Sequence, residues 1–280
     1  MTCAQPNSSQ ISVLSLPSLS ERRFGGMARL YGMDGAARIA SAHVLIVGIG
    51  GVGSWVAESL ARSGVGQLTL IDMDHVSESN INRQIHALES TVGQAKVLAM
   101  KDRIAQINPD CVVRVVDDFV TPENWTDIIT SLQANGHSSN EVDVVIDACD
   151  QVKAKVVMAQ WALSHRKFFV TLGAAGGKRE AHRVEQADLS QVTHDPLLSQ
   201  LRYRLRKEHG APKEGKKMAV QCVFSRENVA PPDPSCNMAG DGSLNCHGYG
   251  SVVTVTATFG MVAASLALNF LAQGLIKTKK

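Results

Sequence analysis

The chain has 280 residues, and 28 lysines and arginines against 26 aspartates and glutamates give a formal net charge of +2. This length fits one large core, alone or with a smaller lobe, and the balanced charge excludes a protein that binds polyanions over its whole surface. The six cysteines form no Cys-x-x-Cys pair, which argues against a structural zinc site and fits a reducing cytoplasm.

The N-terminal segment, residues 1–21, predicts no folded element. It is rich in Ser, Gln and Asn, without a basic start or a continuous apolar run. This composition excludes a secretory signal and indicates a flexible tail.

Strand-like and helix-like patterns then alternate. The predicted strands are residues 43–47, 67–71, 111–116, 142–146 and 168–172, and the predicted helices are 52–63, 94–107, 122–132 and 152–165. Strands rich in Val and Ile that alternate with helices predict a mostly parallel sheet covered on both faces. The expected fold class is therefore α/β, Rossmann-like and doubly wound.

The pattern changes after residue 173. Residues 184–189 and 218–224 indicate strands, and 196–209 indicate a basic helix. We expect residues 181–246 to form a substrate-binding insertion, either as a lobe or as long loops.

The C-terminal segment, residues 252–276, is almost free of charge, long enough to span a bilayer, and followed by three lysines. Polar residues such as Thr256 and Asn269 interrupt it, which favours a buried helix over 250–276. A single membrane span, or association with the inner membrane, is the alternative.

A glycine-rich turn joins the first predicted strand to the first predicted helix. Such a turn is a phosphate cradle, because its backbone and the helix N-terminus approach an anionic ligand. Asp72 ends the next strand, where an acidic side chain binds ribose hydroxyls, and Asp74 either shapes the same loop or is an ordinary turn residue. A nicotinamide-dependent dehydrogenase also fits these features. The glycines are Gly48, Gly50, Gly51 and Gly53.

The polar residues that follow favour nucleotidyl transfer. Several cationic and amide side chains near a nucleotide site suit a triphosphate, on which charge builds as pyrophosphate leaves. The helix dipole disfavours a lysine at a helix start unless an anion binds there. The residues concerned are Asn80, Arg83, Gln84 and Lys96.

Two aspartates follow the predicted strand 142–146. Asp147 stands at the carboxyl edge of the sheet, where a carboxylate can hold Mg²⁺ between phosphate oxygens. Asp150 is expected to cap helix 152–165 or to have a lesser role in the site.

Together these motifs resemble the ubiquitin-activating-enzyme superfamily of adenylyltransferases, of the ThiF/MoeB type. Segments 23–32, 118–122 and 256–260 are similar to the bacterial tRNA threonylcarbamoyladenosine dehydratases, and the resemblance runs from about residue 22 to residue 274. It implies an adenylation domain over 22–280, ATP and Mg²⁺ as cofactors, a homodimer, Asn80 and Arg83 on the triphosphate, and Asp147 on the metal.

The resemblance also implies a reaction. The carboxylate of the threonyl group on a modified tRNA adenosine attacks the α-phosphate of ATP, and the carbamoyl group of the same side chain then closes a ring and releases AMP. Intramolecular attack needs no covalent enzyme intermediate. Cys246 stands where the family has a cysteine, so it is a catalytic candidate, with a packing role as the alternative.

One position departs from the pattern. Related adenylyltransferases often carry Arg-x-x-Arg near the N-terminus, and its second arginine reaches the ATP of the partner subunit. Here Arg23 is followed at that spacing by Gly26, so Arg23 and Arg29 are the alternatives for this role.

Residues 201–217 contain seven lysines and arginines against two glutamates. This excess favours a phosphate-binding patch for tRNA over a solvated helix face, and Tyr203 is placed to stack on an unpaired base. Arg202 and Arg206 share one helical face. The predicted tRNA-binding residues are Arg202, Arg206, Lys216 and Lys217.

Two further functions within the superfamily stay open beside the dehydrogenase. One is activation of a ubiquitin-like or sulfur-carrier protein, which the missing Cys-x-x-Cys pairs and the basic insertion disfavour. The other is a sulfur relay with a cysteine desulfurase as partner, with which Cys246 is consistent.

Overall fold

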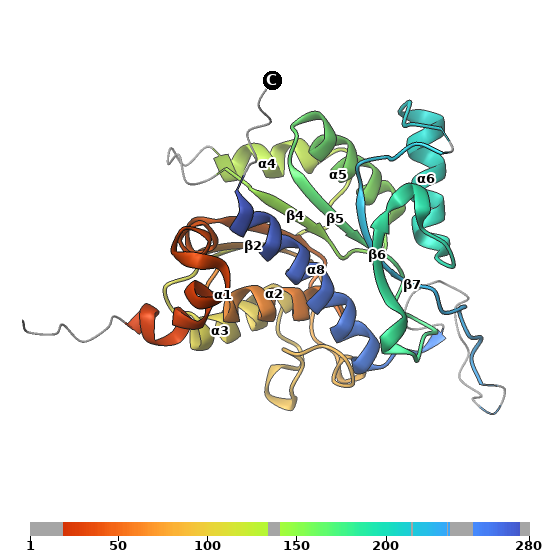
Figure 1. The fold of residues 1–280 in the computed structure, drawn as a ribbon. Helices are drawn as coiled ribbons and strands as arrows, with labels where there is room; N and C mark the ends of the chain where they lie inside the picture. Colours follow the sequence, from red (N-terminus) through yellow and green to blue (C-terminus); the bar gives the residue numbers. More distant parts are fainter. Residues whose placement is uncertain (1–18, 134–140, 214, 234, 236–248, 275–280) are drawn as a thin grey trace, which may run out of the picture.

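The computed structural model describes residues 19–133, 141–213, 215–233, 235 and 249–274. Its centre is a seven-stranded sheet with the order β3-β2-β1-β4-β5-β7-β6 (Figure 1). All neighbouring strands are parallel except β6 and β7. This is the Rossmann-like α/β fold that the sequence predicts. The strands are β1 His43–Val47, β2 Gln67–Ile71, β3 Val112–Val116, β4 Val144–Asp147, β5 Phe168–Leu172, β6 Val184–Asp188 and β7 Gln221–Ser225.

Helices cover both faces of the sheet, because the central strands are apolar on both sides. In β1, Val44 and Ile46 pack into one core with α1, α2, α3 and α8, whereas Leu45 and Val47 pack into the other with α4, α5 and α6. This arrangement is typical of parallel sheets. The helices are α1 Leu19–Ser41, α2 Gly53–Arg62, α3 Lys96–Ile107, α4 Trp125–Gln133, α5 Val152–Ser164, α6 Pro196–Glu208 and α8 Val253–Gln273.

The apolar C-terminal segment forms α8, which packs along α2 and α1 (Figure 1). Its length and composition would allow it to cross a membrane, but 56% of its most apolar window is buried inside the fold. Gly260 is the point of closest approach, since a Cβ there would lie 2.7 Å from Trp55 Cβ. These contacts support the predicted buried helix.

The segment expected to be an insertion contributes to the same sheet. β7 pairs in parallel with β5, β6 pairs antiparallel with β7, and α6 lies between them in sequence. The described part of residues 181–246 is therefore an extension of the sheet with one α-helix and two short 3₁₀ helices. Cys246 lies outside the described residues, as do residues 1–18 of the predicted tail.

Helix α1 was not predicted from the sequence. It contains Gly25, Gly26, Gly32 and Gly35, and Gly32 has φ 75°, which kinks the helix. Glycines at this density hide the apolar periodicity on which helix prediction depends. The second half of α1 is held to the C-terminal helix by Arg38, whose Nε donates to the Ala272 carbonyl at 3.0 Å.

Candidate active site

The glycine turn lies at the carboxyl ends of β1, β2 and β4, at the point between β1 and β4 where the strand order reverses. Backbone hydrogen bonds join these ends, from Gly48 N to Ile71 O at 2.8 Å and from Ala148 N to Val47 O at 2.8 Å. Ligands of open α/β folds bind outside the strand ends at such a switch point. The predicted glycines therefore occupy the expected position for a nucleotide.

Two of the glycines are required by close backbone contacts. Gly48 has φ 86°, and a Cβ there would lie 2.9 Å from the Ala148 carbonyl carbon. A Cβ at Gly53 would lie 1.8 Å from the Gly48 oxygen. Gly50 has no atom within 4 Å of its ideal Cβ position, so the turn is open on that side.

Asp72 ties the end of β2 to the glycine turn. Its Oδ2 accepts a hydrogen bond from Ile49 N at 2.6 Å, and its Oδ1 accepts one from Asp74 N at 2.9 Å. Burial raises the pKa of Asp72, although the nearby Lys96 ammonium acts in the opposite direction. The carboxylate is thus fixed beside the turn, and its contact with a ribose stays a prediction.

Lys96 opens α3 and forms an ion pair with Asp74. Its Nζ lies 2.7 Å from Asp74 Oδ2, and its backbone N–H donates to the Asp74 carbonyl at 2.9 Å. The lysine is nearly buried, whereas the carboxylate is half exposed. Asp74 therefore positions Lys96, which supports the loop-shaping alternative.

Arg83 lies across the glycine turn. A Cβ at Gly51 would lie 3.3 Å from Arg83 Cγ, and one end of the guanidinium is fixed by Nη1 donating to the Ser79 carbonyl at 2.6 Å. Its buried Nε has no hydrogen-bond partner among the described residues. The same is true of Gln84 Oε1 and of Ser54 Oγ in the first turn of α2.

Buried atoms without a partner also occur on Gln67, His86 and Trp125 among the described residues, so they are compatible with a nucleotide at the turn but do not mark it alone. A buried polar atom without a partner costs about 1–3 kcal/mol, so proteins seldom retain one that no ligand or water satisfies. Ser54 adds to the predicted set, although a lone serine after a glycine motif gives little signal in a sequence. Asn80 is buried too, but its Oδ1 accepts from Ser77 N at 3.2 Å and holds a short 3₁₀ helix, Glu78–Asn80, in place.

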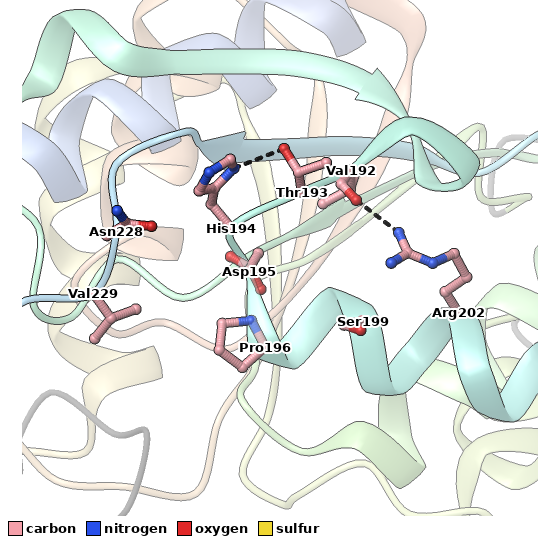
Figure 2. Close-up of a pocket in the computed structure, with 9 residues that line it drawn as sticks. All are labelled: Val192, Thr193, His194, Asp195, Pro196, Ser199, Arg202, Asn228 and Val229. Atoms are coloured by element: carbon pink, nitrogen blue, oxygen red, sulfur yellow. Dashed lines mark hydrogen bonds between the residues drawn. The ribbon is translucent and has the colours of Figure 1, made fainter.

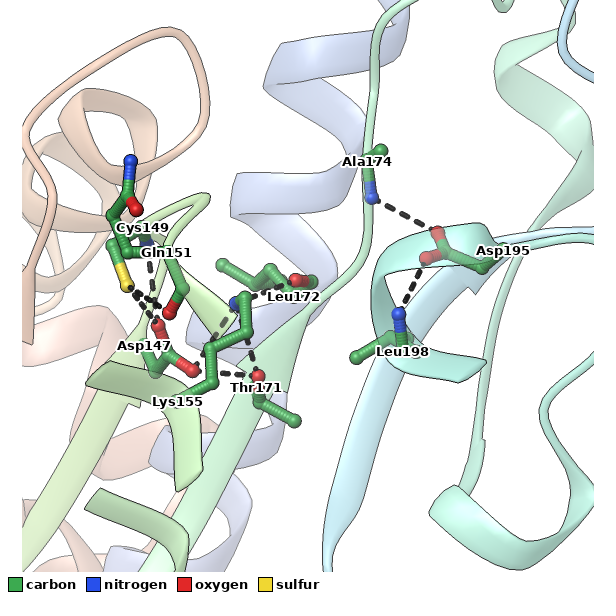
Figure 3. Close-up of polar contacts among 9 residues, drawn as sticks. All are labelled: Asp147, Cys149, Gln151, Lys155, Thr171, Leu172, Ala174, Asp195 and Leu198. Carbon is green, nitrogen blue, oxygen red and sulfur yellow. Dashed lines mark hydrogen bonds and ion pairs between the residues drawn. The ribbon is translucent and has the colours of Figure 1, made fainter. Parts of the chain in front are cut away.

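Asp147 does not fit its predicted role as a metal ligand. β4 continues to Asp147, so this side chain follows Val145 to the face that α5 covers. There Oδ2 accepts from Lys155 Nζ at 3.1 Å and from Thr171 Oγ1 at 2.7 Å, and Oδ1 accepts from Cys149 N at 3.2 Å and from Cys149 Sγ at 3.0 Å (Figure 3). The carboxylate is fully enclosed.

Lys155 completes this buried group. Its Nζ donates to Asp147, to Thr171 and to the Leu172 carbonyl, so all three ammonium hydrogens are used. Burial lowers the pKa of Lys155, but Asp147, Cys149 and Asp195 together raise it by more, so the net pKa is raised. Sequence reasoning missed Lys155 and Thr171, because their role depends on a partner from another element.

Asp150 is the exposed carboxylate at the same edge. It was expected to cap α5, but the N-cap residue is Gln151, and no side chain caps the helix. Asp150 Oδ1 accepts one long hydrogen bond from Gln151 Nε2, at 3.4 Å. It therefore keeps coordination sites that Asp147 lacks.

The four predicted tRNA-binding residues lie in two places. Arg202 and Arg206 lie on α6, whereas Lys216 and Lys217 are exposed in the loop before β7. Arg202 is partly committed to the fold, because its Nη1 donates to the Leu189 and Val192 carbonyls at 3.0 and 2.7 Å.

The buried ion pair between Asp147 and Lys155 should contribute to the free energy of unfolding. Replacing Lys155 with Met leaves the Asp147 charge without its partner, which should lower the free energy of unfolding by about 3–5 kcal/mol in urea titrations. Lys153→Met is the matched control, because Lys153 is exposed on the same helix, and it should change stability by less than about 0.5 kcal/mol. Adding Asp147→Asn to Lys155→Met should recover part of the loss. Equal free energies of unfolding for Lys155→Met and Lys153→Met would show that the buried pair contributes nothing to stability.

The comparisons with known proteins agree with this geometry. A model of the ThiF family matches residues 25–279. The chain is 46% identical over 257 residues to the tRNA threonylcarbamoyladenosine dehydratase of Escherichia coli, covering 89% of this chain and 92% of that protein. It is 40% identical over 261 residues to the dehydratase of Haemophilus influenzae, covering 92% and 97%. The solved structure of the E. coli enzyme in complex with ATP has 43% sequence identity to this chain and a TM-score of 0.78. The match covers 92% of this chain and 97% of the chain in that structure. The chain therefore belongs to the ThiF family and, within it, to the tRNA threonylcarbamoyladenosine dehydratases.

Proposed function

We propose that this protein dehydrates threonylcarbamoyladenosine in tRNA to its cyclic form, with ATP as the driving co-substrate. The observation that carries the proposal is the glycine turn at the ends of β1, β2 and β4, with Arg83 lying across it and the Asp72 carboxylate bound to its Ile49 amide. The similar dehydratase of Escherichia coli has been crystallised with ATP and with AMP.

The first step is attack of the substrate's threonyl carboxylate on the α-phosphate, with loss of pyrophosphate. Negative charge grows on the leaving group, and the fixed cations Arg83 and Lys96 stabilise it electrostatically. Asp72 binds the ribose hydroxyls through the lone pairs that its two backbone contacts leave free. The glycine turn and the start of α2 supply the backbone amides.

The second step is ring closure. The carbamoyl group attacks the acyl-adenylate of the same side chain, and AMP leaves. Both reacting groups belong to one substituent, so the enzyme has only to orient them and to exclude water. This chemistry works without a cysteine nucleophile, and a catalytic role of Cys246 stays a prediction.

The metal is placed on Asp150. Mg²⁺ keeps several waters and takes one or two carboxylates together with substrate phosphates, which suits one exposed aspartate at a strand end. When bound, the ion neutralises phosphate charge. Asp147 and Lys155 act beneath it by holding the segment that carries Asp150.

The assembly and the location are proposed by analogy. We infer a cytoplasmic homodimer, and the exposed apolar side chains of Leu30 and Met33 on α1, which are 73% and 77% exposed, support a partner surface. A cysteine desulfurase partner stays a prediction.

The function is tested with purified protein, ATP and tRNA that carries threonylcarbamoyladenosine. The expected result is release of pyrophosphate and AMP and a nucleoside lighter by one water, measured by mass spectrometry after digestion. The Arg83→Met protein is the negative control. Pyrophosphate release that needs a small carrier protein and no tRNA would support the alternative adenylyltransferase function.

The fixed cations should act mainly on turnover. Lys96→Met and Arg83→Met should each lower kcat by about 100-fold, while the KM for ATP changes little, because their charge matters most as pyrophosphate departs. Lys101→Met, an exposed position on α3, is the matched control and should keep full activity. A raised KM with unchanged kcat would assign the residue to ground-state binding.

Variants of Asp147 and Asp150 should respond differently when the reaction rate is measured as a function of Mg²⁺ concentration. Asp150→Asn should raise the Mg²⁺ concentration needed for half-maximal rate, since it removes a charged ligand. Asp147→Asn should leave this concentration unchanged and lower stability. The reverse result would support Asp147 as the metal ligand.

A further inference from the structure

One face of α6 carries two shallow, open depressions. Two adjoining hollows, of about 400 and 420 Å³, share Ser199 and Arg202 in their walls. The outer hollow is lined by Ser199, Arg202, Tyr203, Arg206, Lys207 and Lys213. We call these two hollows together the α6 groove.

The helix period produces this face. Ser199, Arg202, Tyr203, Arg206 and Lys207 are spaced as i, i+3, i+4, i+7 and i+8, which aligns them along one side of a helix. The opposite side is made of leucines that pack into the core, namely Leu197, Leu198, Leu201 and Leu205. The polar stripe is therefore presented outward by a helix that is anchored along its length.

The inner end of the groove lies close to the candidate active site. Asp195 caps α6 through Oδ1, which accepts from Leu198 N at 2.9 Å, and its Oδ2 accepts from Ala174 N just after β5, also at 2.9 Å (Figure 3). β5 is the neighbour of β4, and Thr171 lies opposite Asp147 in the register. The inner hollow lies between the first turn of α6 and the segment with Asn228 and Val229 (Figure 2).

The outer end is cationic. Its lining includes Arg202, Arg206, Lys207 and Lys213 and no carboxylate. None of these four forms an ion pair within the described part of the chain. Arg202 and Arg206 bond to neutral carbonyls instead, Arg206 Nε to Pro212 O at 3.2 Å, so they are oriented without being neutralised.

An aromatic ring lies among these cations. Tyr203 is 61% exposed, and Lys207 Nζ lies 5.4 Å from its ring centroid. An exposed ring beside unpaired cations is the combination with which proteins bind single-stranded nucleic acid, since the ring stacks on a base while the cations hold phosphates. A paired base in a helix is already stacked and cannot use the ring.

We propose that the α6 groove binds the unpaired RNA strand next to the modified adenosine, with Tyr203 stacking on one neighbouring base and Arg206, Lys207 and Lys213 holding its phosphates. This inference rests on the proposed function for the identity of the RNA. It makes Tyr203 a residue that selects looped over paired RNA. It also adds Lys207 and Lys213 to the predicted patch, in which Lys216 and Lys217 stay predictions.

The test uses the full chain and two labelled RNAs, an anticodon stem–loop and a blunt duplex of equal length. Tyr203→Ala should weaken binding of the stem–loop by about 5- to 100-fold, the range for loss of one base stack, and leave the duplex unaffected. Tyr203→Phe should bind like the wild type. Stem–loop binding by Tyr203→Ala that equals the wild type, or equal losses for both RNAs, would overturn the proposal.

The charges are tested by salt dependence. Arg206→Ala should reduce the slope of log Kd against log salt by about one. Arg204→Ala is the matched control, because Arg204 lies on the same helix outside the groove lining and faces Glu208, and it should keep the slope. Poly-glutamate should compete poorly with the stem–loop. Competition as strong as that of unlabelled stem–loop would indicate a site for acidic proteins and overturn the proposal.

Activity separates this inference from the function on which it rests. If the wild-type protein dehydrates tRNA and Tyr203→Ala binds the stem–loop with unchanged affinity, only the proposed RNA-binding role of the α6 groove is refuted. Wild-type protein that yields no nucleoside lighter by one water refutes the proposed function, whatever the variants bind.

Discussion

The contact between the glycine turn and the end of β4 is the constraint on which the site depends. Gly48 lies so close to the Ala148 backbone that a side chain at this position would collide with it. The approach places the nucleotide turn, Asp72 and the segment from Asp147 to Asp150 along one edge. Residues that are distant in the chain are thereby brought to one edge of the sheet.

Beneath that edge, Asp147 and Lys155 have a structural role, which is distinct from the ligand-binding role proposed for Asp150. Two buried charges gain little net stability, because desolvation offsets their attraction, but losing either one leaves the other unpaired. The pair therefore fixes the strand end in one conformation. Asp150, which is exposed and almost free of contacts, remains available for a ligand.

The sequence was sufficient for the fold class and for most strands of the sheet, whereas the residues of the nucleotide site stay predictions. β1, β2 and β5 begin and end where the sequence predicts, because a buried strand is visible as a short and mostly apolar segment. Helix α1 was missed because its glycines obscure the apolar period. The metal was placed on Asp147 because a sequence shows a carboxylate but not the hydrogen bonds that already occupy it. Lys155 was missed for the same reason, since a lysine in a helix is usually solvated.

The packing of α8 has a consequence for synthesis on the ribosome. The side chain of Thr256 lies against the glycine turn, 3.4 Å from the ideal Cβ position of Gly51, and Gly260 fits against Trp55 on α2. The proposed ATP site at the glycine turn thus takes one wall from a helix that is synthesised more than 190 residues after the turn. Chains emerge N-terminus first, so a partly synthesised chain carries the whole glycine motif without this wall. Nascent chains should therefore hold ATP poorly until α8 has left the exit tunnel.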